Sequence, residues 1–182
     1  QKNFIKGQIM NKLLTSIFII LSLSFCTLFA KDGYGISVNG GRGSTVDIAR
    51  LGIQKDFESI IYSNETFNLK GFHELGLNYW NGNRKNISAV SYSPVFVVDF
   101  NQYTTQGYKP YVDFGIGIAF LSDTLIDSKN MSSSFQFEDR ISLGITKDNI
   151  DMYIRYMHYS NGGIKKPNDG INMGLIGFNY RF

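Results

Sequence analysis

From residue 33 to residue 182, apolar and polar residues alternate in short runs that are rich in Tyr, Phe, Ile and Val. Gly, Asn, Asp, Ser and Lys separate these runs, as expected for strands that are joined by turns. No long stretch here has the 3.6-residue apolar period of an amphipathic helix. The pattern predicts eight strands, over residues 33–40, 43–57, 71–81, 87–101, 109–121, 132–146, 149–160 and 170–182.

The alternation gives each predicted strand one apolar face and one polar or small-residue face. In the run 109–121, the apolar face holds Val112, Phe114, Ile116, Ile118 and Phe120. In the run 132–146, the polar face holds Gln136, Glu138, Arg140 and Ser142. A soluble sandwich would bury the apolar faces, whereas a membrane barrel would turn them toward lipid. Alternation alone leaves both architectures open.

The first 30 residues resemble an export signal that begins at Met10. Lys12 supplies a positive n-region, residues 13–29 form an apolar h-region, and Leu28-Phe29-Ala30 is a plausible cleavage site. A membrane-spanning helix is the rival interpretation, but small residues end the run and no basic cluster follows it. Cys26 does not fit a lipoprotein signal, because Phe25 stands where a small residue is needed. We therefore divide the chain into upstream residues plus signal peptide (1–30) and one mature domain (31–182).

Export, an even number of strands and strand lengths of about ten residues favour an eight-stranded antiparallel transmembrane β-barrel. The ending Phe178–Phe182 also resembles the aromatic C-terminal strand of outer-membrane proteins. Side chains fill the interior of a barrel this small, so a porin is not expected. Four charged residues should point inward and form a hydrogen-bonded network: Asp113, Glu138, Arg140 and Arg155. Aromatic girdle candidates at the two ends are Tyr79, Trp80, Tyr92, Tyr103, Tyr108, Tyr156 and Tyr180.

Composition and charge exclude several classes of function. The chain has 18 Lys and Arg against 15 Asp and Glu, but Lys2, Lys6 and Lys12 precede residue 31 and no acid does. The mature domain therefore carries 15 of each sign, which leaves no basic face for a nucleic acid. One Cys and two His rule out a disulfide scaffold and argue against a multi-His metal centre. We expect no cofactor.

The segment 155–172 carries the candidate chemistry. His158 and Ser160 are two residues apart at the end of a predicted strand, so they point to the same side, the one that holds Tyr156. The next strand should bring Asn172 beside them, with all three side chains on the outer face. A Ser nucleophile, a His base and a third polar group that orients the imidazole form a hydrolase arrangement. By spacing alone, an interfacial histidine beside a turn is the simpler interpretation.

This segment resembles the lipid A 3-O-deacylase (PagL-type) family of Gram-negative outer membranes. The resemblance is carried by His158-Tyr159-Ser160-Asn161-Gly162-Gly163 and Pro167-Asn168-Asp169-Gly170-Ile171, with support from residues 92–97, 115–119 and 135–140. It implies an eight-stranded barrel with a lipid-facing esterase site that acts on lipid A or lipopolysaccharide. Ser160 would be the nucleophile and His158 its base. The oxyanion candidates would be Asn168, Asn161 and backbone amides near Gly162 and Gly163, and a homodimer is suggested as well.

The chain departs from the family pattern at Asn172, where the family has a Glu that supports the His. Asn can accept a hydrogen bond from the imidazole, but it brings no negative charge. A catalytically weakened barrel with a structural or lipid-binding role is therefore the alternative function. An acyltransferase barrel fits less well, because its catalytic groups do not match this His-x-Ser hairpin. Asp139 falls on an apolar face without an assigned role, and Asp169 is interpreted as a hairpin-turn residue rather than a replacement acid.

Overall fold

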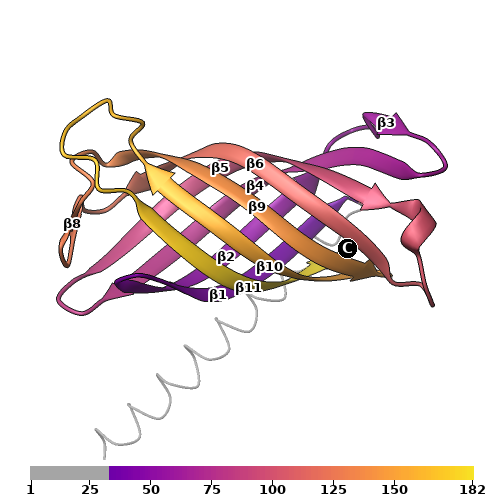
Figure 1. Ribbon diagram of the computed structural model, residues 1–182, viewed down its shortest axis with the longest axis horizontal. Coiled ribbons are helices and arrows are strands. Elements are labelled where there is room, and N and C mark those ends of the chain that lie inside the picture. The colour runs from indigo at the N-terminus through magenta and orange to yellow at the C-terminus, as the bar shows by residue number, and fades with distance from the viewer. Residues whose placement is uncertain (1–32) are drawn as a thin grey trace, which may run out of the picture. The chain divides into compact units, whose positions relative to one another are not determined.

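The computed structural model describes residues 33–182, so the predicted signal peptide and the start at Met10 lie outside the described residues. Eight long antiparallel strands form the barrel (Figure 1). They are β1 (Tyr34–Gly43), β2 (Val46–Asp56), β4 (Phe67–Gly82), β5 (Asn86–Phe100), β6 (Lys109–Leu121), β9 (Phe135–Lys147), β10 (Ile150–Ser160) and β11 (Ile171–Arg181). The connections hold β3 (Tyr62–Ser63), β7 (Leu125–Ile126), β8 (Lys129–Asn130) and the 3-10 turn η1 (Asn101–Tyr103).

The sheet closes because β1 pairs with both β2 and β11, and β2 pairs in turn with β4. Every sequential pair of long strands is antiparallel, which confirms the predicted eight-stranded barrel. Tyr34 and Arg181 lie at one end of the barrel, and the β10–β11 loop with its flanking Ser160 lies at the other (Figure 1). Among residues 33–182, no helix has the length and apolar character needed to cross a membrane.

Exposure of the strand residues decides between a sandwich and a membrane barrel. Ile116 and Ile176 are 70% and 71% exposed on the outer wall, whereas Asp113 and Glu138 inside are 1% and 0% exposed. A barrel with apolar side chains on its outer wall and charged side chains in its interior is suited to a surrounding of lipid. The faces predicted for the runs 109–121 and 132–146 are confirmed in β6 and β9.

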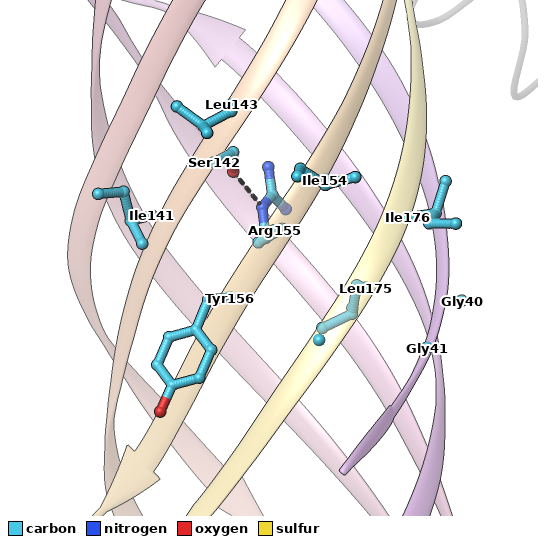
Figure 2. Close-up of a pocket in the computed structure, with 11 residues that line it drawn as sticks. Gly40, Gly41, Ile141, Ser142, Leu143, Ile154, Arg155, Tyr156, Leu175 and Ile176 are labelled. Atoms are coloured by element: carbon cyan, nitrogen blue, oxygen red, sulfur yellow. Dashed lines mark hydrogen bonds between the residues drawn. The ribbon is translucent and has the colours of Figure 1, made fainter.

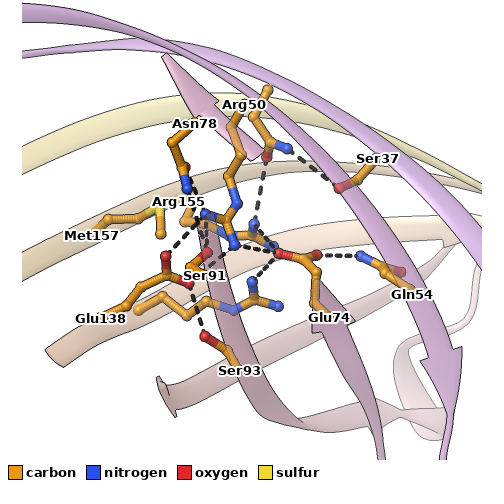
Figure 3. Close-up of polar contacts among 12 residues, drawn as sticks. Ser37, Arg50, Gln54, Glu74, Asn78, Ser91, Ser93, Glu138, Arg155 and Met157 are labelled. Carbon is orange, nitrogen blue, oxygen red and sulfur yellow. Dashed lines mark hydrogen bonds and ion pairs between the residues drawn. The ribbon is translucent and has the colours of Figure 1, made fainter. Parts of the chain in front are cut away.

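The interior is filled in three zones. Fourteen buried apolar residues, including Trp80, Met157 and Tyr159, pack toward the β10–β11 loop. A smaller apolar cluster around Phe72 and Tyr111 fills the opposite part. The third zone is the polar network shown in Figure 3, which includes Arg50, Glu74 and Glu138. All four predicted inward charges are buried. A filled interior agrees with the expectation that the protein is not a porin.

Arg50 and Glu74 are the members of this network that the sequence did not reveal. Arg50 donates to Glu74 Oε1 at 2.8 Å and to both carboxylate oxygens of Glu138 at 2.9 and 3.0 Å. Arg140 reaches the same Glu74 oxygen, and Arg155 lies 3.6 Å from Asp113. Three arginines thus face three carboxylates in the barrel interior, which makes the burial of six charges tolerable.

Two local expectations were wrong. The expected end of the first strand at residue 40 lies inside β1, since Gly40 and Gly41 pair with Ile176 and Leu175 of β11. Glycine suits this position because a Cβ on Gly41 would lie 2.1 Å from the Gly174 carbonyl oxygen. Trp80 is fully buried inside the barrel rather than placed in a girdle. Its neighbour Tyr79 faces outward, so the two-residue period turns Trp80 inward.

Candidate functional site

The inner face of β10 determines where His158 and Ser160 point. Met157 and Tyr159 alternate with them and are completely buried in the barrel. The Tyr159 hydroxyl donates to Glu138 Oε2 at 2.8 Å, and its ring packs edge-on against Trp80 with centroids 4.8 Å apart. With these side chains anchored inside, the pleat directs His158 and Ser160 to the outer wall.

His158 lies directly opposite Asn172 on β11, and the two side chains form a hydrogen bond of 2.5 Å between Nδ1 and Oδ1. An amide oxygen only accepts, so with this amide orientation the imidazole Nδ1–H is the donor. In the neutral imidazole with this tautomer, Nε2 carries no proton and can accept one. The structure therefore brings together two of the three predicted catalytic residues in the arrangement that a general base requires.

Ser160 is the next outward residue along β10 after His158. Within residues 33–182, the two side chains share a face but form no hydrogen bond with one another. Catalytic hydrogen bonds are often long before substrate binds, so this geometry is compatible with a nucleophile and its base.

The loop that follows β10 is organised by Asn161, which is fully buried. Its Nδ2 donates to the carbonyls of Met131 and Lys165, and its Oδ1 accepts from the Gly163 amide. Both amide protons of Asn161 and the Gly163 N–H are thus used within the loops. Of the predicted oxyanion donors, Asn168 and the backbone amide of Gly162 remain.

Asn168 uses only its oxygen in this loop. Its Oδ1 accepts from the Asn161 backbone amide at 3.0 Å. Within the described part of the chain, its Nδ2 makes no hydrogen bond and stays available as a donor. Through this bond Asn168 lies against the residue that follows Ser160, the candidate nucleophile, and a donor without a structural partner is what an oxyanion hole needs.

Gly170 is a site residue that sequence reasoning did not single out. Its φ is +56°, and a Cβ there would lie 3.2 Å from Cε1 of the His158 ring. Gly170 thus closes the loop against the imidazole in a conformation that suits glycine. In the sequence, Gly170 is part of the Asn168-Asp169-Gly170 run, and the structure shows that Gly170 lies against the His158 ring.

Asp169 fastens this loop to the neighbouring one. Its Oδ2 accepts from the Asn130 amide at 2.6 Å, and its own amide donates to the Asn130 carbonyl at 3.3 Å. Asp169 therefore ties the β10–β11 loop to the β6–β9 loop, and within residues 33–182 it forms no hydrogen bond or ion pair with His158. This agrees with its interpretation as a turn residue rather than a replacement acid.

We expect Asp169→Ala to lower kcat/KM by roughly tenfold, since losing one charge-assisted hydrogen bond loosens the loop that holds Asn168. Barrel stability should change little, because the contact joins two loop regions and lies outside the eight barrel strands. The measurement is the rate of the ester hydrolysis that the sequence resemblance implies, for the folded variant beside Glu58→Ala, which removes an exposed carboxylate in the loop at the opposite barrel end. Equal rates for both variants would contradict this role of Asp169.

Two apolar grooves flank the outward histidine. The larger, of about 520 Å³, crosses β1, β11, β10 and β9 and is lined by Ile141, Leu143, Ile154, Tyr156 and Ile176 around Gly40, Gly41 and Gly174 (Figure 2). A Cβ at Gly40 or Gly174 would meet no atom within 4 Å, so these glycines leave the groove open. The second, of about 310 Å³, shares Ile141 and Tyr156 and reaches His158 and Asp139. Elongated apolar ligands fit such surfaces.

In the described part of the chain, no group of three or more His, Cys, Asp or Glu side chains is placed to hold a metal ion.

Known proteins resemble this chain along most of its length. The family model described as lipid A 3-O-deacylase (PagL) matches residues 47–181. A lipid A deacylase PagL of Pseudomonas aeruginosa is 34% identical over 164 residues, which cover 88% of this chain and 93% of that protein. One from Bordetella bronchiseptica is 34% identical over 111 residues, or 60% and 61% of the two chains. The crystal structure of the outer membrane enzyme PagL aligns with a TM-score of 0.76 at 32% identity, covering 81% of this chain and 99% of that one.

Proposed function

We propose that this chain, which belongs to the lipid A 3-O-deacylase (PagL) family, is an outer-membrane esterase acting on lipid A. The reaction is hydrolysis of the ester that links a 3-hydroxyacyl chain to the 3-position of lipid A. The observation that carries this proposal within the chain is the His158–Asn172 hydrogen bond on the lipid-facing wall, one outward position from Ser160. A membrane-embedded substrate can reach such a site without leaving the bilayer.

In this mechanism, the Ser160 hydroxyl attacks the ester carbonyl carbon and His158 Nε2 takes its proton. Negative charge develops on the carbonyl oxygen, where Asn168 Nδ2 is the proposed donor. Collapse of the tetrahedral intermediate breaks the bond to the sugar oxygen, which receives the proton from His158. Water, activated by the same histidine, then releases the acyl chain from Ser160.

The apolar groove beside Tyr156 is the proposed place for an acyl chain of the substrate. Its lining is mainly apolar. It lies one outward row from His158, since Tyr156 and Gly174 face each other as His158 and Asn172 do. Because this wall faces lipid, a chain in the groove would be held by van der Waals packing and not by the removal of apolar surface from water.

We expect Gly174→Leu to fill this groove and to raise KM about tenfold, with kcat changed less. The barrel should tolerate the change, because a Cβ at this position meets no atom within 4 Å. Steady-state kinetics on lipid A in detergent micelles provide the measurement, with Val90→Leu as the control because Val90 is exposed on the outer wall and does not line this groove. An unchanged KM in Gly174→Leu would remove the groove from the substrate site.

The test of the proposed reaction is mass spectrometry of lipid A incubated with the purified, folded protein. Loss of one 3-hydroxyacyl chain is the expected result, and the released acid should be found as the free 3-hydroxy fatty acid. A gain in mass would indicate acyl transfer instead. An unchanged mass would contradict the proposal, provided that an active PagL-family enzyme assayed separately removes the chain from the same lipid A.

A second candidate function rests on Asn172, a neutral residue where the family pattern has an acid. A barrel with little or no activity and a structural or lipid-binding role would leave lipid A intact with the parent chain. Asn172→Glu separates the candidates, because restored activity would identify a deacylase weakened at this residue. The homodimer suggested by the family resemblance is a further proposal, which chemical cross-linking in membranes tests.

A further inference from the structure

Asp139 differs from every other acid on the described strands. The other seven strand carboxylates each lie within 4.0 Å of an Arg or Lys nitrogen. Within residues 33–182, Asp139 has neither an ion pair nor a hydrogen bond. It is half-buried on the outer wall, where an unpaired carboxylate is costly. A costly group kept without a structural partner is a functional candidate.

The register places Asp139 beside the proposed base. It lies directly opposite His158 in the β9–β10 pair, while Asn172 lies directly opposite His158 in the β10–β11 pair. The three residues therefore form one outward row across three neighbouring strands, with the imidazole in the middle. Opposite side chains on one face have Cβ atoms about 4.5–5.5 Å apart. Asp139 and His158 also line the same apolar groove.

An acid beside a catalytic histidine orients the imidazole and also stabilises its positive charge, whereas Asn172 can only orient the ring. Its Oδ1 holds the Nδ1–H and so selects the tautomer, but it adds no charge. When His158 takes the proton of Ser160, a positive imidazolium forms at the edge of the lipid. Two opposite charges about 6 Å apart attract each other strongly where the effective dielectric constant is about 20 or below.

We propose that Asp139 is a positioning residue that stabilises the protonated form of His158 and supplies the negative charge that Asn172 lacks. The inference rests on the proposed deacylase function. A single acid on β11 would both orient the imidazole and balance its charge. In this chain, Asn172 on β11 orients the ring and Asp139 on β9 balances its charge.

A double-mutant cycle tests this division. Deacylation rates are measured for the parent, Asp139→Asn, Asn172→Glu and the double variant, with Ser160→Ala as the inactive reference. Asp139→Asn keeps the size of the side chain, and the electrophoretic mobility of the unheated protein reports whether the barrel has folded. The expected loss is about 100-fold for Asp139→Asn in the parent. In the Asn172→Glu background, the loss should shrink to roughly threefold, because the new acid already supplies the charge.

Each outcome separates the inference from the function on which it rests. An active parent that Asp139→Asn leaves unchanged overturns the inference alone, and so does an equal loss in both backgrounds, which marks a merely structural residue. Activity that appears only with Asn172→Glu also overturns it, because Asp139 then fails to replace the acid. Silence of all variants, Asn172→Glu included, overturns the proposed function together with the inference.

Discussion

Replacement of Ser160 by Ala should reduce release of the hydroxyacyl chain at least about a thousandfold, since removing the nucleophile of a serine hydrolase removes the covalent pathway. His158→Asn should have an effect of similar size. The double variant should be no worse than either single one, because residues that act as one unit are not additive. The measurement is the rate of free 3-hydroxy fatty acid release from lipid A by folded protein.

Ser88→Ala is the matched control for this series. Ser88 is an exposed serine on β5 near the same end of the barrel, and its removal should leave the rate within about twofold. Wild-type rates in Ser160→Ala would show that the hydroxyl at residue 160 does not take part. Additive losses in the double variant would show that Ser160 and His158 do not act in one step.

The second large effect is on stability. Glu74→Gln should lower the free energy of unfolding by about 3–5 kcal/mol, because it leaves buried arginines without their counter-charge. Glu74 lies 2.8 Å from Arg50, also contacts Arg140, and accepts from Gln54 at 2.7 Å. Figure 3 shows how Arg50 and Gln54 approach its carboxylate.

Urea titration of the barrel in detergent or lipid, followed by tryptophan fluorescence, measures this change. Trp80 is the chain's one tryptophan and is fully buried in the interior, so its emission reports loss of the core. Glu65→Gln, which neutralises an exposed loop carboxylate, is the control and should shift the unfolding midpoint little. A Glu74→Gln protein as stable as the control would show that the arginines find other partners.

Much of the barrel could be predicted from the two-residue period, because lipid outside and a filled interior impose opposite demands on alternate residues. Val112 and Asp113 thus revealed their faces from sequence position alone. The end of β1 was predicted too early because of Gly40 and Gly41, since glycine occurs both in turns and where two backbones approach closely. Trp80 was misplaced because composition favoured a girdle while its position in the strand required the interior.

Contacts of the site could be predicted where they depend on strand geometry alone, but not where they depend on the conformation of loops. The pairing of His158 with Asn172 follows from two strands joined by one hairpin, and the structure shows that contact. The engagement of Asn161 with Met131 depends on a second loop, 30 residues away in sequence. The row that joins Asp139 to His158 depends on the register between β9 and β10, which no local pattern encodes.

The most direct test of a serine-dependent hydrolysis at this outer wall is deacylation in oxygen-18-labelled water, with mass spectrometry of both products. The proposed mechanism predicts that the released 3-hydroxy fatty acid gains the label, because water attacks the acyl group on Ser160, and that the deacylated lipid A keeps its unlabelled 3-hydroxyl. Ser160→Ala should yield neither product. Label in the lipid A hydroxyl, or release of an unlabelled acid, would contradict the account.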